Sequence, residues 1–205
     1  MKTFHAVSAL LATCCFIISC KTSSPTSPTT TTTGVPTAIG TPVGSPATGT
    51  IDASGGSLLS PDGRLEVVVP AGALATATSI SVQPITNETP GGVGVGFSML
   101  PNGQTFSKPV TLTFHYSPDD LAGTDANALA VAVQKDDRIW YEFNTSSLDE
   151  SAGTLSITTS HFSNYDLLSR FRIAPDHAEI NVNKTQSLEV RIATPATVDN
   201  DPPMS

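Results

Sequence analysis

Apolar and polar residues alternate in short runs from Gly49 onward, and turn-forming residues separate these runs. A period of two places successive side chains on opposite faces of an extended chain, so the pattern predicts β-strands and not helices. Sequences such as Pro61-Asp62-Gly63 and Pro101-Asn102-Gly103 mark the turns. The predicted strands are 56–60, 64–69, 79–84, 93–100, 110–116, 128–134, 139–143, 154–159 and 161–168. About nine strands at this spacing predict an all-β fold, an antiparallel β-sandwich over residues 50–169.

Two further alternating runs, 178–182 and 187–192, follow the predicted sandwich. They are typical of the first strands of a second β module, of immunoglobulin type, at 170–205. Such a domain needs about 100 residues, whereas 33 residues follow Arg172 in the 205-residue chain. Either the second module is truncated, or these strands form a C-terminal extension that packs on the first domain. We favour truncation.

Residues 21–49 are almost entirely Ser, Thr, Pro and Gly, with few large apolar side chains. Such a segment buries too little apolar surface to offset the entropy of ordering it. With Cys20, it is therefore predicted to form a disordered tether over 20–49, which would span about 90 Å in polyproline geometry.

The first 19 residues have the layout of a signal peptide. Lys2 precedes an apolar run, and Ile17-Ile18-Ser19-Cys20 is similar to the bacterial lipobox, in which the cysteine is acylated and becomes the mature N-terminus. The alternative is an ordinary cleaved signal peptide. A lipid-anchored protein of the bacterial cell envelope is expected, with Cys20 as the lipidation site. Lys21, in place of an inner-membrane retention Asp, favours the outer membrane.

Composition limits the partners of the chain. The formal net charge is −8 and the pI is about 4.7, so no basic surface is available to neutralise phosphates, and nucleic acid is not an expected partner. The sequence contains no phosphate-binding loop, no nucleophile elbow and no His/Cys spacing typical of a metal site. Neither a cofactor, a metal nor a small-molecule substrate is therefore expected.

Three segments carry a recognisable pattern in order: GGSLLSPDGRLEVVVPAGAL (55–74), ISVQPIT (80–86) and FSMLPNGQTFSKPVTLTFHY (97–116). Together they resemble the ZU-five domain (ZO-one and Unc-five type), which occurs in ankyrins, netrin receptors and PIDD and in bacterial surface proteins. The resemblance covers about residues 50–169. It implies a β-sandwich that acts as a protein-interaction module, with a protein partner that the sequence does not identify.

The tripeptide His161-Phe162-Ser163 has a counterpart in some members of this family, where self-cleavage occurs between Phe and Ser. The resemblance implies that His161 would take the Ser163 hydroxyl proton. Ser163 Oγ would then attack the Phe162 carbonyl, and water would hydrolyse the resulting ester. The alternative is a plain strand with His161 and Ser163 on one face and Phe162 on the other, and we favour this structural interpretation.

The sequence therefore predicts a protein without catalytic turnover that displays an interaction module at the cell envelope. Self-cleavage at Phe162-Ser163 is the first alternative. The second is an adhesin or carbohydrate-binding module centred on Trp140, where Tyr141 and Arg138 lie nearby in the sequence.

Overall fold

The computed structural model describes residues 34–176, 182, 184–193 and 195–198. The predicted signal peptide, Cys20 and the first part of the tether lie outside these residues, as does most of the run at 178–182. In chain order the strands are β1 (Ala47–Ile51), β2 (Gly56–Leu59), β3 (Leu65–Val69), β4 (Thr78–Ile85), β5 (Gly92–Leu100), β6 (Thr105–His115), β7 (Leu129–Gln134), β8 (Trp140–Phe143), β9 (Ser147–Asp149), β10 (Thr154–His161), β11 (Asn164–Ser169), β12 (Phe171–Ala174), β13 (Glu189–Ile192) and β14 (Ala196–Val198). Two 3₁₀ turns, η1 (Pro118–Leu121) and η2 (Ala126–Ala128), precede β7.

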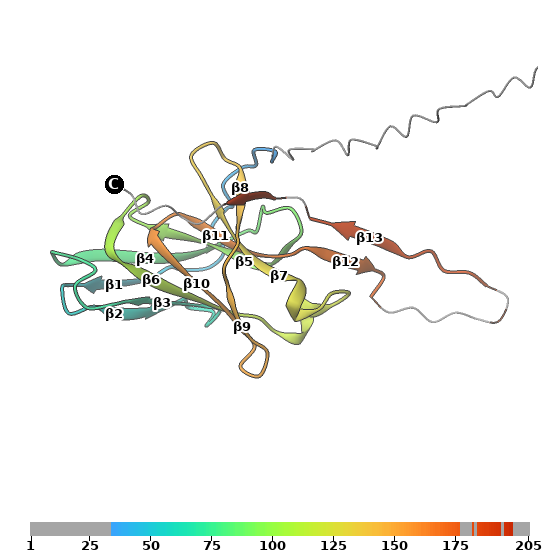
Figure 1. Cartoon of the computed structure of the whole chain (residues 1–205), viewed down its shortest axis with the longest axis horizontal. Coiled ribbons are helices and arrows are strands. Elements are labelled where there is room, and N and C mark those ends of the chain that lie inside the picture. The colour runs from blue at the N-terminus through green and yellow to red at the C-terminus, as the bar shows by residue number, and fades with distance from the viewer. Residues whose placement is uncertain (1–33, 177–181, 183, 194, 199–205) are drawn as a thin grey trace, which may run out of the picture. The chain divides into compact units, whose positions relative to one another are not determined.

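Two sheets form the body of the molecule (Figure 1). The larger has the strand order β1-β4-β5-β11-β7-β8-β14, and the smaller has the order β2-β3-β6-β10-β9. Neighbouring strands are antiparallel, except that β14 runs parallel to β8. The predicted all-β sandwich is confirmed.

The core lies between these sheets and follows the alternation seen in the sequence. On β3, Leu65, Val67 and Val69 are buried, while the intervening residues are at least partly exposed. The side chains of β5 and β6 meet across the core, where the rings of Phe97 and Phe114 make an edge contact at 6.1 Å. Burial of a large apolar side chain stabilises a fold by roughly 1.5–3 kcal/mol, so this alternation specifies which face of each strand turns inward.

Two strands of the larger sheet, β7 and β11, are buried along their whole length. Residues 37–42 contact the same sheet at β7, β8 and the end of β4. The indole N–H of Trp140 donates to Thr37 Oγ1 (2.8 Å), and the side-chain amide of Gln134 donates to the Ala38 carbonyl (3.2 Å). Gly40 passes so close that a β-carbon there would meet the Thr86 carbonyl. The prediction of a tether reaching residue 49 is therefore wrong from residue 37 onward, because polar side chains hold this segment on the sheet.

The C-terminal strands belong to the same unit as the sandwich. β12 and β13 form a separate two-stranded ribbon, and β14 extends the larger sheet beside β8 (Figure 1). Of the two predicted arrangements, packing on the first domain agrees with the pairing of β14 with β8; truncation of a second module stays a prediction.

Candidate functional site

His161-Phe162-Ser163 forms the crossover between the two sheets. β10 of the smaller sheet ends at His161, and β11 of the larger sheet begins at Asn164. The register of β10 against β6 shifts between Thr159 and His161. The single strand predicted over 161–168 is therefore wrong at its start, because the chain changes sheets within the tripeptide.

Phe162 is the apolar anchor of this crossover. Its side chain is fully buried, and its ring makes an edge contact with that of Phe106 at 4.8 Å. Its backbone N–H donates to the Gln104 carbonyl (2.9 Å), and its carbonyl accepts from the Gly103 N–H (2.9 Å). Both backbone polar groups of Phe162 are thus satisfied by the turn between β5 and β6.

Ser163 is also buried, and its hydroxyl is used by the fold. Ser163 Oγ donates to the backbone carbonyl of Gln134 (2.7 Å), while the Ser163 carbonyl accepts from the Met99 N–H (3.0 Å). Since the hydroxyl has one proton, that proton is directed at Gln134 and not at an imidazole. The contact links the crossover to the end of β7.

His161 is half-buried and lies beside Tyr165, with ring centroids 6.5 Å apart. Its carbonyl accepts from the Tyr165 hydroxyl (2.8 Å) and from Thr159 Oγ1 (3.1 Å). These bonds fix the backbone at the end of β10. The hydrogen bonds described for these three consecutive residues stabilise the crossover, and their role in cleavage stays a prediction.

Asp166 in β11 was missed by sequence reasoning. Its side chain is fully buried; Oδ2 accepts from Thr89 Oγ1 (2.9 Å), whereas Oδ1 has no hydrogen-bond partner. The carboxylate packs against Gly96, where a β-carbon would overlap it. Burial raises the pKa of Asp166 to about 7, although hydrogen bonds from Thr89 and the Glu88 backbone act in the opposite direction. A carboxyl group between Tyr165 and Leu167-Leu168 in a predicted strand was the available signal.

Trp140 is buried, with 1% of its surface exposed. Its ring faces are therefore not available to stack on a sugar, and a carbohydrate site centred on Trp140 is not supported. The indole N–H serves instead to hold the segment at Thr37.

Asp120 is buried in the first 3₁₀ turn. Burial acts to raise its pKa, but hydrogen bonds from Ser117 and Arg64 outweigh this effect and leave the pKa below its usual value. The Arg64 guanidinium lies 2.5 Å from the carboxylate. The pair joins the start of β3 to the loop before β7.

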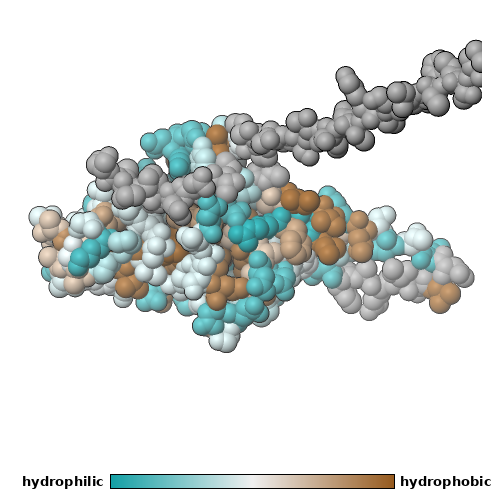
Figure 2. Space-filling model, viewed as in Figure 1, coloured by the Kyte–Doolittle hydropathy of each residue, from teal (hydrophilic) through white to brown (hydrophobic). Residues whose placement is uncertain are grey.

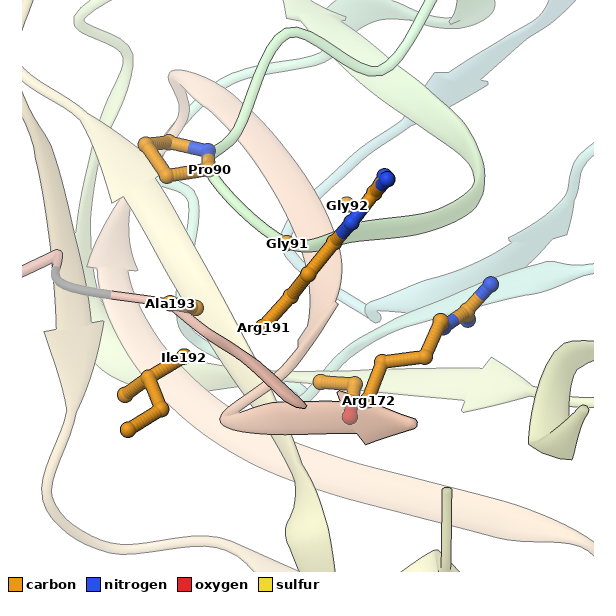
Figure 3. Close-up of a pocket in the computed structure, with 8 residues that line it drawn as sticks. Pro90, Gly91, Gly92, Arg172, Arg191, Ile192 and Ala193 are labelled. Atoms are coloured by element: carbon orange, nitrogen blue, oxygen red, sulfur yellow. The ribbon is translucent and has the colours of Figure 1, made fainter. Parts of the chain in front are cut away.

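A cleft of about 350 Å³ lies where the ribbon joins the sandwich. Arg172 and Arg191 extend along it toward the same side, next to the backbone of Gly91 and Gly92 (Figure 3). A β-carbon on Gly91 would lie 2.6 Å from the Ala193 side chain, so glycine permits this close approach. At this cleft the end of the ribbon therefore packs closely against the backbone of the sandwich at Gly91.

One face of the ribbon is apolar and exposed. Phe171 pairs with Ile192 and Ile173 with Val190, so their side chains share a face. Their exposed fractions range from 38% for Ile173 to 72% for Ile192. Figure 2 shows these apolar residues gathered on the ribbon. Contiguous exposed apolar surface of this kind is typical of interaction sites.

Within the described ranges, no group of three or more His, Cys, Asp or Glu side chains is placed to hold a metal ion. No helix in that same part of the chain is long and apolar enough to cross a membrane.

No protein-family model matches the chain, and no curated protein matches it significantly. The resemblance to the ZU-five domain therefore stays a prediction based on its motifs.

Proposed function

We propose that the chain is a non-catalytic, lipid-anchored protein of the bacterial cell envelope, and that its β-sandwich displays an interaction surface. The observation that carries this proposal is the exposed apolar face of the β12–β13 ribbon: Phe171, Ile173, Val190 and Ile192. The lipid anchor at Cys20 is inferred from the lipobox-like sequence before it. The partner binds the ribbon, and the buried core of the sandwich supports that ribbon.

The interaction surface is tested by incorporating a photo-crosslinking amino acid at Ile173 in living cells. The matched control places the same amino acid at Leu59, an exposed apolar residue on β2. We expect discrete crosslinked species from position 173 and none from position 59. Equal labelling from both positions, or none from either, would contradict an interaction surface on the ribbon.

The anchor is tested by metabolic labelling with a palmitate analogue. We expect the wild-type chain to be labelled and the Cys20→Ala variant to be unlabelled. A labelled Cys20→Ala chain would place the lipid on another residue, and an unlabelled wild type would contradict lipid anchoring.

Self-cleavage between Phe162 and Ser163 is the second candidate. One observation favours it: the Phe162 carbonyl oxygen, on which negative charge would develop, accepts a hydrogen bond from the Gly103 N–H (2.9 Å). The bond from Ser163 Oγ to the Gln134 carbonyl disfavours it, because the hydroxyl would have to leave this acceptor before it could transfer its proton to His161. We therefore rank self-cleavage below non-catalytic display.

A further inference from the structure

The ribbon has one covered edge, which belongs to β12. The Ile173 N–H donates to the Gly123 carbonyl (2.7 Å), and the Phe171 carbonyl accepts from Thr124 Oγ1 (2.7 Å). In an antiparallel strand the N–H and C=O of one residue point to the same side. The backbone groups of Phe171 and Ile173 therefore face away from β13, toward the loop that covers them.

The other edge, on β13, is open. Ile192 and Val190 are the register partners of Phe171 and Ile173, so their backbone groups face away from β12 by the same alternation. Among the described residues, β13 pairs only with β12, and no hydrogen bond from another segment reaches these outward groups. A row of unpaired N–H and C=O groups is a template for another strand.

Residues 188–192 are complementary to themselves when reversed. The sequence is Leu188-Glu189-Val190-Arg191-Ile192. Rotation by half a turn about Val190 places Glu189 opposite Arg191 and Leu188 opposite Ile192. Every apolar residue then meets an apolar residue, and every charge meets its opposite.

The phase of the hydrogen bonds agrees with this pairing. Val190 has outward-facing backbone groups, so it would meet the Val190 of the second strand as a hydrogen-bonded pair. Glu189 and Arg191 then form the non-hydrogen-bonded pair, in which Cα atoms lie about 4.5 Å apart and side chains are closest. In the single chain these two side chains are 62% and 67% exposed and 3.1 Å apart, so both are accessible on one face.

We propose that the β13 edge pairs with the same edge of a second copy of the chain, antiparallel about Val190. The product is a four-stranded sheet, β12-β13-β13-β12, in which the apolar faces of two ribbons lie side by side. A two-fold contact of this kind requires a self-complementary surface, which the charge pattern of 188–192 supplies. The second copy would be one partner of the proposed interaction surface. Only the location of this dimer at the cell envelope rests on the proposed function.

The test measures the molar mass of the purified full chain by sedimentation over a wide concentration range, with charge variants in β13. We expect a concentration-dependent dimer for the wild type. Glu189→Arg and Arg191→Glu each place like charges opposite one another twice, and each weakens the dimer by roughly tenfold or more. The double variant Glu189→Arg/Arg191→Glu restores opposite charges and the wild-type affinity. An equimolar mixture of the two single variants forms a mixed dimer.

Two further variants separate pairing from folding. Lys184→Glu is the charge control. It makes the same charge change as Arg191→Glu, at an exposed position between β12 and β13, and we expect it to leave the dimer intact. Val190→Pro removes an outward N–H and abolishes the dimer without removing a bond within the ribbon; unchanged circular dichroism confirms its fold.

A wild type that stays monomeric overturns the proposal, as do single variants that dimerise like the wild type. These outcomes leave the proposed function standing if position 173 still crosslinks to a different protein in cells. Absence of crosslinks at position 173, together with dimers in solution, would instead count against the proposed function.

Discussion

The crossover at His161-Phe162-Ser163 and the β12–β13 ribbon use similar side chains in opposite ways. At the crossover, Phe162 is fully buried and the Ser163 hydroxyl is bonded to Gln134. On the ribbon, Phe171 is 42% exposed and the outer edge of β13 is open. The residues that suggested catalysis, such as Ser163, form hydrogen bonds that stabilise the fold. By contrast, β13 keeps an open edge and an exposed apolar face that are available for binding.

This difference separates two kinds of experimental effect. A change at the crossover should lower the free energy of unfolding, because it removes buried contacts. A change on the exposed face of the ribbon should leave that free energy nearly constant and alter association instead. Measuring stability and association on the same variants therefore tests the assignment of each region.

The largest effect is expected from Phe162→Ala. The substitution leaves a cavity beside Phe106 at the point where the chain changes sheets, and we expect the free energy of unfolding to fall by about 3–5 kcal/mol. The measurement is urea denaturation. The matched control is Phe171→Ala, for which we expect less than about 1 kcal/mol, since its ring is 42% exposed. Equal losses from the two variants would contradict the proposed division between the regions.

The next largest effect concerns Asp166, which is buried in β11, the strand that follows the crossover. Its pKa is raised by burial to about 7 from an ordinary value of 3.8. Between these values the folded state holds a proton that the unfolded state releases, so stability falls as pH rises through this window and stays low above it. The shift corresponds to about 4 kcal/mol. Glu88 is the charged neighbour that also raises this pKa.

We expect Asp166→Asn to remove this slope, so that unfolding free energies measured from pH 4 to 8 become nearly constant. Asp52→Asn is the control, because Asp52 is exposed and hydrogen bonds from Ser54 lower its pKa. Its substitution should leave the slope in place. A wild type that is as stable at pH 8 as at pH 5 would show that Asp166 is not buried in this way.

The sequence predicted the sandwich because period-two alternation reports burial on one face of a strand. It predicted less well where few side chains are large. β1, with the sequence Ala-Thr-Gly-Thr-Ile, carries little apolar signal; it was not predicted as a strand, and residues 47–49 were assigned to the tether. The contacts of Thr37 with Gln134 and Trp140 join residues about 100 positions apart, and no local pattern reports such contacts.

The candidate site shows the same limit of local patterns. The sequence identified His161, Phe162 and Ser163 as candidates. It did not show whether the Ser163 hydroxyl faces an imidazole or a carbonyl, because its acceptor, Gln134, lies 29 residues earlier in the chain. Conversely, the open edge of β13 could not be predicted from its own residues, because the edge is defined by the loop at Gly123 that covers only β12.

A smaller effect is expected from Ser163→Ala, which leaves the buried Gln134 carbonyl without this donor. We expect a loss of about 1–3 kcal/mol in unfolding free energy. The same variant tests self-cleavage by intact mass spectrometry of the purified, incubated chain. We expect the wild type and Ser163→Ala both to show only uncleaved chain. Fragments that separate at Phe162-Ser163 in the wild type and vanish in the variant would establish self-cleavage.

The smallest effect on stability is expected from Ile192→Ser on the open edge. Ile192 is 72% exposed, so the free energy of unfolding measured on dilute monomer should change by less than about 0.5 kcal/mol. In the proposed dimer Ile192 lies opposite Leu188, and the loss of this apolar pair on both sides of the two-fold axis should weaken association by roughly tenfold. Sedimentation and urea denaturation on the same sample distinguish the outcomes. A large loss of stability with unchanged association would place Ile192 in the core of the fold, and the ribbon would then resemble the crossover rather than contrast with it.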